Sequence, residues 1–163
     1  MYYIIINPEA GKGRAVKAVE PVEQVLKENN IKYRLMYTQY PGHAMELVRE
    51  AKVAGCSRVI SIGGDGTLRE IAKDLLYSNI PLATIPAGTG NDFSKTISVP
   101  KDYEQAAHIA ISDDLHTIDA MESSNGLCIN IACIGLDAQA VYNAAKFKRF
   151  LRGIAAYFAG FLV

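Results

Sequence analysis

Three glycine-containing turns in this chain each follow an apolar run of strand length, and their residue types suit phosphate binding. We call residues 7–13, 63–67 and 86–92 the first, second and third glycine loops. Glycines let backbone N–H groups approach a phosphate closely, and a following helix N-terminus adds a favourable dipole. Ligands of open α/β sheets bind beyond the carboxyl ends of the strands. We therefore expect the three loops to line one sheet edge as a nucleotide site.

Asp65 stands between the glycines of the second loop. A lone carboxylate repels phosphate, so its presence suggests an intervening Mg²⁺ or a hydroxyl partner. A second interpretation is that Asp65 caps the helix that follows, and both roles can hold together. The Walker A and GxGxxG patterns do not occur in the sequence. This argues against a P-loop enzyme and against the common dinucleotide site.

Hydrophobic periodicity predicts the elements that position these loops. Apolar runs of strand length alternate with helical spacing, which is typical of βα units around a parallel sheet. The expected strands are residues 2–6, 33–38, 58–62 and 82–85. The expected helices are residues 15–28, 43–54, 67–77 and 103–111. Pro21 either kinks the first helix or opens its main part, Gly55 ends the second, and Asp102 caps the last.

The pattern changes after Asp113. Residues 115–121 and 127–133 are expected to be strands joined by a turn at 123–126, an antiparallel hairpin. We therefore predict an α/β nucleotide-binding domain over residues 1–113 and the start of a β-rich second domain over residues 114–163.

The last segment, from about Asp137, has helical propensity and is basic and then apolar. We interpret it as helices of the second domain, with an interfacial membrane helix as the alternative. Its apolar face, if uncovered, favours a homodimer.

Composition argues against several other classes. Lys plus Arg equals Asp plus Glu at 17 each, so no overall field draws the chain to nucleic acid. Cys56, Cys128 and Cys133 show no metal-ligand spacing and are expected to be reduced thiols of a cytoplasmic protein. The start of the chain lacks the features of a signal peptide, and no run reaches the roughly 18 apolar residues of a membrane span.

Four motifs, in this order, resemble the diacylglycerol kinase catalytic domain, a lipid kinase family that includes bacterial diacylglycerol kinases and sphingosine and ceramide kinases. They are NPxxG at 7–11, Thr38 with PGHA at 41–44, GGDGT at 63–67 and PAGTGNDF at 86–93. GGDGT is shared with NAD kinases and, more distantly, with phosphofructokinases, whereas the other motifs are more specific to lipid kinases. The resemblance implies an NAD kinase-like α/β fold, ATP and Mg²⁺ as cofactors, and a diacylglycerol-like lipid hydroxyl as acceptor at a membrane surface.

The resemblance also implies which residues bind the nucleotide. By matching position they are Asn7, Pro8, Gly11, Thr38, Gly63, Gly64, Asp65, Gly66, Thr67, Glu70, Gly88, Thr89, Gly90, Asn91 and Asp92. Asp65 is the one expected to reach Mg²⁺, through the phosphates. Arg69 departs from the asparagine of many relatives, and His43 is expected to pack or cap at a helix start rather than to act as an acid or base.

The later acidic motif of the family, which supplies the general base, has no counterpart in these residues. We therefore expect no catalytic base within this chain, and nucleotide binding without phosphoryl transfer when the chain is alone. The expected role is in lipid metabolism and phospholipid biosynthesis, in the cytoplasm or peripherally at the inner membrane face. Two alternatives stay open: an NAD kinase-like small-molecule kinase, disfavoured by residues 86–93, and a nucleotide-binding module without catalysis.

Overall fold

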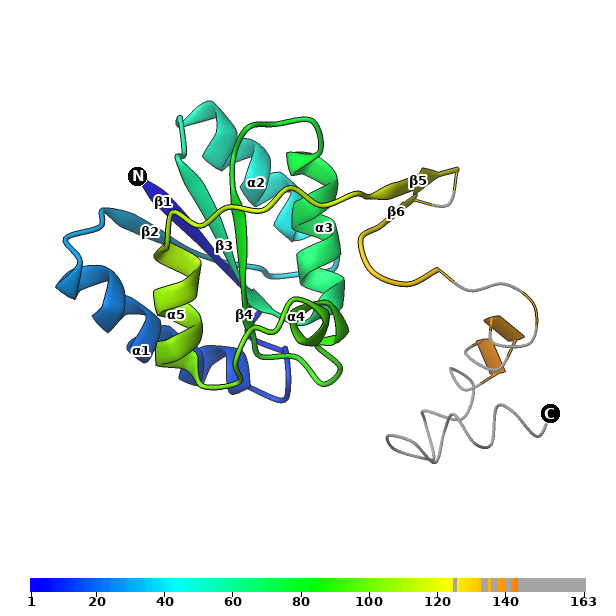
Figure 1. Cartoon of the computed structure of the whole chain (residues 1–163), viewed down its shortest axis with the longest axis horizontal. Helices are drawn as coiled ribbons and strands as arrows, with labels where there is room; N and C mark the ends of the chain where they lie inside the picture. The colour runs from blue at the N-terminus through cyan, green and yellow to red at the C-terminus, as the bar shows by residue number, and fades with distance from the viewer. Residues whose placement is uncertain (125, 133–134, 136–137, 140–141, 144–163) are drawn as a thin grey trace. The chain divides into compact units, whose positions relative to one another are not determined.

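The computed structural model describes residues 1–124, 126–132, 135, 138–139 and 142–143. Its contacts divide the chain into two units, Met1–Asn130 and Ile131–Val163. All the helices and strands below lie in the first unit, and the predicted boundary near Asp113 stays a prediction. In that unit a four-stranded parallel sheet, in the order β2-β1-β3-β4, has helices on both faces (Figure 1).

The strands of this sheet are β1 (Tyr2–Ile6), β2 (Tyr33–Tyr37), β3 (Arg58–Gly63) and β4 (Leu82–Pro86). The helices are α1 (Arg14–Glu28), α2 (His43–Val53), α3 (Asp65–Leu75), α4 (Asp92–Thr96) and α5 (Tyr103–Ile111). A short antiparallel hairpin of β5 (Met121–Ser123) and β6 (Gly126–Cys128) follows. The predicted α/β fold with a parallel sheet is confirmed.

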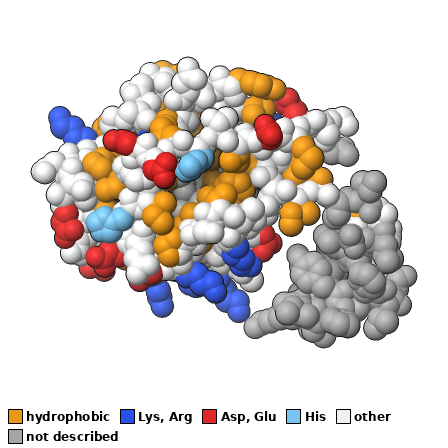
Figure 2. Space-filling model, viewed as in Figure 1, with side chains coloured by type: hydrophobic (Ala, Val, Ile, Leu, Met, Phe, Trp, Pro, Cys, Tyr) orange, Lys and Arg blue, Asp and Glu red, His pale blue; other side chains and the backbone are white. Residues whose placement is uncertain are grey.

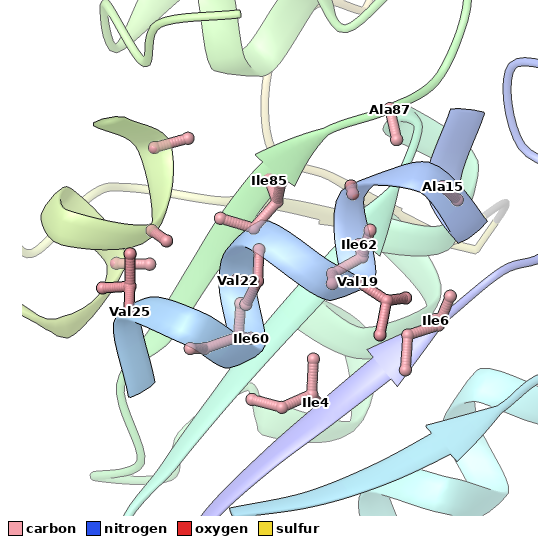
Figure 3. Close-up of a cluster of buried hydrophobic side chains, with 14 of the residues drawn as sticks. Ile4, Ile6, Ala15, Val19, Val22, Val25, Ile60, Ile62, Ile85 and Ala87 are labelled. Carbon is pink, nitrogen blue, oxygen red and sulfur yellow. The ribbon is translucent and has the colours of Figure 1, made fainter. Parts of the chain in front are cut away.

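Each face of the sheet packs a separate hydrophobic core, because successive side chains of a strand point to opposite faces. Ile4 and Ile6 of β1 meet the apolar sides of α1 and α5 (Figure 3). Tyr3 and Ile5 of the same strand meet α2 and α3. These four side chains are at most 1% exposed. The uniformly apolar β1 is therefore a central strand covered on both sides, as parallel sheets require.

Local chemistry sets the helix ends that the sequence predicts. Asp102 Oδ1 accepts a hydrogen bond from Gln105 N at 2.9 Å and so caps α5. Gly55, with φ of +70°, ends α2 in a left-handed conformation that glycine adopts at little cost. Pro21 lies inside α1, seven residues after its first residue Arg14, so it does not open the helix.

The structure differs from the prediction in three places. Helix α3 begins at Asp65, two residues before the expected start, and α4 was not predicted at all. The hairpin is confirmed, but each of its strands has three residues instead of seven. Residues 115–120 form no strand among the described residues, where the hairpin pairs only Met121–Ser123 with Gly126–Cys128. The expected helices after Asp137 lie mostly outside the described residues.

An apolar hollow lies beside β4, the edge strand of the sheet. Its volume is about 1020 Å³, and side chains of α3, β4, α5 and the segment after α5 line it. Leu115 and Ile118 of that segment are 58% and 49% exposed. Figure 2 shows hydrophobic side chains gathered on this face of the first unit. No helix among the described residues is long and apolar enough to cross a membrane.

Candidate nucleotide site

All three glycine loops lie at the carboxyl edge of the parallel sheet, because they leave β1, β3 and β4. The second and third are in direct backbone contact: Ala87 N and Gly88 N both donate to Gly63 O, at 2.8 and 2.9 Å. A Cβ added to Gly88 would lie 2.4 Å from Gly64 Cα. Glycine is therefore required at this contact for steric reasons alone.

The first loop is held against the third. A Cβ added to Gly11 would lie 2.0 Å from Ala87 O, and the φ of Gly11 is +58°. Arg14, the first residue of α1, donates from Nε to Gly11 O at 3.1 Å and from Nη2 to Gly88 O at 2.6 Å. One side chain thus joins two loops, and it reaches Gly88 across 74 residues of the sequence.

Asn7 connects the first loop to the second. Its Nδ2 donates to Thr67 Oγ1 at 3.0 Å, and its Oδ1 accepts from Glu9 N at 3.1 Å. Thr67 is buried in the first turn of α3, and its side chain packs over Gly63, where an added Cβ would lie 2.9 Å from Thr67 Cβ. The amide of Asn7 therefore sets the turn after β1 and fixes it to the start of α3.

Asp65 does not cap its own helix. Gly64 is the N-cap of α3 and provides no side-chain bond, whereas Asp65 Oδ1 accepts from Phe93 N in α4 at 3.1 Å. The capping interpretation of Asp65 for the following helix is therefore wrong, and the carboxylate instead stabilises the N-terminus of α4, 28 residues later. Its other oxygen, Oδ2, faces Gly90 of the third loop.

Asn91 has a buried acceptor between the second and third loops. Its Nδ2 donates to Gly88 O at 2.9 Å, and its backbone is left-handed with φ of +55°. Its Oδ1 is buried and has no hydrogen-bond partner among the described residues. A Cβ added to Gly88 would lie 2.7 Å from this oxygen. A buried acceptor without a hydrogen bond costs about 1–3 kcal/mol, so this oxygen lowers the stability of the fold.

The carboxylates of Asp65 and Asp92 converge on Gly90. A Cβ added there would lie 3.0 Å from Asp65 Oδ2 and 3.2 Å from Asp92 Oδ2. Lys95 Nζ pairs with the other oxygen of Asp92, Oδ1, at 2.9 Å. No group of three or more acidic, His or Cys side chains in the described part of the chain is arranged to hold a metal. Mg²⁺ is usually held by one or two carboxylates together with phosphates and waters, and this pair fits that role.

Glu70 joins α3 to the loop that precedes α2. Its Oε1 accepts from Gly42 N at 3.1 Å, and Gly42 is the N-cap of α2. Thr38 follows β2 at the same sheet edge, and its N–H donates to Ile6 O at 2.8 Å. Glu70 therefore fixes the loop of residues 38–42, which contains Thr38, to helix α3.

His43 packs at the start of α2, as expected. Its Nδ1 accepts from Gln39 N at 3.1 Å, and its ring stacks on Tyr40 with centroids 4.5 Å apart. The Tyr40 hydroxyl donates to Glu46 Oε2, and this hydrogen bond raises the pKa of Tyr40. These contacts give the histidine a structural role.

Most of the predicted site residues are brought together by these contacts. The united set is Asn7, Gly11, Gly63, Gly64, Asp65, Thr67, Gly88, Gly90, Asn91 and Asp92. Pro8, Gly66 and Thr89 belong to the same three loops. Arg14 was missed by the sequence reasoning. The available signal was a basic residue directly after a glycine loop, a pattern too common to identify a contact by itself.

Gly66 is a glycine of the second loop with open space around it among the described residues. Substitution by alanine should therefore affect stability in the opposite direction at Gly66 and at Gly88. Gly66 is the second residue of α3, and a Cβ added there would have no atom of the described residues within 4 Å. We expect Gly66→Ala to raise the free energy of unfolding by up to about 1 kcal/mol, because alanine loses less backbone entropy in a helix. Denaturant titration measures this, and a clear loss of stability would contradict it.

These features define a parallel α/β domain that gathers three glycine loops and two carboxylates at one sheet edge, with an amide oxygen that has no partner among the described residues. The model of the diacylglycerol kinase catalytic domain matches residues 1–123. The chain therefore belongs to this lipid kinase family, as the motifs suggested.

Comparison with individual proteins gives the same family assignment. The chain is 32% identical over 153 residues to a Pseudomonas fluorescens protein named "Probable lipid kinase YegS-like", covering 92% of this chain and 50% of the relative. It is 37% identical over 103 residues to sphingosine kinase B of Dictyostelium discoideum, covering 59% of this chain and 14% of the relative. A crystal structure of a diacylglycerol kinase from Bacillus anthracis superposes with a TM-score of 0.63 at 30% identity, covering 77% of this chain and 47% of that one. The chain thus spans about half the length of the Pseudomonas relative and of the Bacillus kinase.

Proposed function

We propose that the three glycine loops bind ATP and that this chain is the nucleotide-binding part of a lipid kinase. The observation that carries the proposal is the packing of the three glycine loops at one sheet edge, where Gly88 lies so close to Gly64 that it has no room for a side chain. Backbone N–H groups of glycine loops suit the phosphates.

The reaction we infer is transfer of the γ-phosphoryl group to a diacylglycerol-like hydroxyl. The acceptor oxygen bonds to the γ-phosphorus as the bond to the β–γ bridging oxygen breaks, ADP leaves, and the hydroxyl proton passes to a base. Bound Mg²⁺ would neutralise phosphate charge, and Asp65 and Asp92 are the residues that would hold it. The residues of this chain orient the phosphates and fix the loops that surround them. We place the base and the lipid site outside the described residues, and the setting at a membrane surface.

Asp65→Asn is the test of the nucleotide site. Asparagine keeps an oxygen for Phe93 N–H and therefore the fold, but it removes the negative charge. ATP with Mg²⁺ at 100 times its Kd is expected to stabilise the wild type by roughly 2.7 kcal/mol, seen as a raised melting temperature. We expect the variant to lose this shift while its melting temperature without nucleotide stays close to that of the wild type.

Asp74→Asn is the matched control, since it makes the same change near the other end of α3. Asp74 accepts from Arg49 through both carboxylate oxygens, at 2.8 and 3.3 Å, and asparagine keeps one of these acceptors. This variant should keep the full ATP-dependent shift. An intact wild type that ATP does not stabilise would overturn the proposal. Parallel assays of diacylglycerol and NAD as acceptors, with any longer protein that contains this chain, separate the lipid kinase from an NAD kinase-like enzyme.

A further inference from the structure

Arg14 is an exposed arginine whose side chain is nevertheless fixed. Exposed arginines usually move freely in solvent, and ordering one costs rotamer entropy. Here the guanidinium has two backbone anchors, Gly11 O at 3.1 Å and Gly88 O at 2.6 Å. It lies so close over Gly11 that an added Cβ would be 2.5 Å from Arg14 Nε. The glycine therefore makes room for the guanidinium as well as for the turn.

The guanidinium lies next to the contact between the second and third glycine loops, where we propose that the nucleotide binds. Gly88 O, which accepts from Arg14, also accepts from Asn91 Nδ2 at 2.9 Å. Gly88 itself packs against Gly64 of the second loop. The cation thus shares an acceptor with Asn91, and it lies where the first and third loops meet.

The charge of Arg14 has no acidic partner in the described part of the chain. None of the ion pairs found there involves Arg14. A guanidinium carries five N–H donors, and the two anchoring bonds use two of them. Three donors and a full positive charge are left for another acceptor. Guanidinium groups bind phosphate oxygens through paired, charge-assisted hydrogen bonds.

We propose that Arg14 is a phosphate-binding residue that the first and third glycine loops hold in position for the polyphosphate of the nucleotide. The inference rests on the proposed nucleotide site and adds to it the residue that recognises the anionic end. Because both anchors are backbone carbonyls, the guanidinium needs no reorganisation when phosphate arrives. A lysine at this position lacks the planar fork of donors, and an ammonium that held both carbonyls would keep a single N–H for the phosphate.

Calorimetric titration of the chain with ATP and, separately, with inorganic tripolyphosphate tests this proposal. Arg14→Met is expected to weaken both ligands by about 10-fold or more, the usual effect of losing a hydrogen bond to a charged group. Arg14→Lys should fall between this variant and the wild type. Lys73→Met removes one exposed cation from the last turn of α3 and should leave both affinities unchanged.

The outcomes separate this inference from the proposed function. Unchanged affinities in Arg14→Met overturn the inference, and so does an equal weakening of adenosine, which has no phosphate and would report only a loosened fold. If tripolyphosphate binds through Arg14 while ATP binds no more tightly, the inference holds and the nucleotide proposal fails. If the wild type binds neither, both fail. Should Arg14→Met not fold, Arg14→Lys decides, and wild-type affinity in that variant overturns the inference.

Discussion

Replacing Gly88 with alanine is expected to force the second and third glycine loops apart. The new Cβ would lie 2.4 Å from Gly64 Cα and 3.1 Å from Gly64 N, and backbone atoms cannot rotate out of the way as a side chain can. Gly64 is held in turn, because Gly88 N donates to the carbonyl of its neighbour Gly63. We expect the free energy of unfolding to fall by about 2–3 kcal/mol, the cost of forcing atoms into a packed site.

The same substitution should also weaken ATP by at least about 10-fold, because it moves the floor beside Asn91 Oδ1. Denaturant titration measures the stability loss, and calorimetry at a temperature where the variant is folded measures the affinity. Gly66→Ala is the matched control for stability, since it adds the same methyl group to open space. Equal stabilities of the two alanine variants would show that the contact between Gly64 and Gly88 is not close in solution.

Arg58→Met is expected to be the second severe change, although Arg58 is not part of the site. This arginine of β3 is 5% exposed and donates from Nη1 to Ala110 O at 2.7 Å and to Ser112 O at 2.8 Å. Its guanidinium lies over the ring of Tyr2, 5.1 Å from the centroid. It therefore binds the carbonyls at the C-terminal end of α5, which have no partner within the helix.

Methionine can fill the space but cannot donate to these carbonyls. We expect a loss of about 3 kcal/mol in the free energy of unfolding, because the buried Ala110 O and the partly buried Ser112 O both become unpaired. The ion pair of Arg58 Nη2 with Asp113 Oδ1, 3.6 Å apart, contributes little to this loss, because the Asp113 side chain is fully exposed. Arg34→Met, which breaks an ion pair with Glu50 between side chains that are 54% and 48% exposed, should cost less than about 1 kcal/mol. Similar losses in the two variants would contradict this explanation.

The sheet could be predicted closely because its signal is local. The run 2–6 is apolar throughout and bounded by a polar turn, and the structure has β1 over these same residues. The start of α3 was placed too late because Gly66 has low helix propensity and masks the first turn. Helix α4 has five residues and no hydrophobic period to detect. Its N-terminus is stabilised by Asp65, a residue far back in the sequence.

The candidate site also has a part that the sequence predicts and a part that it does not. The spacing of glycines and carboxylates identified the loops, and the parallel topology placed them on one edge. The partners within the site could not be predicted, since each joins residues far apart in the chain. Arg14 meets Gly88 across 74 residues, and Asn7 meets Thr67 across 60.

The sequence by itself determined the family, the parallel α/β fold and the three glycine loops, because periodicity and motif spacing are properties of neighbouring residues. Only the tertiary structure decided what those loops do to one another. In the folded chain Asp65 accepts from Phe93 N of α4 instead of capping its own helix. Asn91 Oδ1 has no partner among the described residues, and Arg14 is held between two loops. The physical reason is that hydrogen bonds and steric contacts act over a few ångströms of space, whatever the separation along the chain.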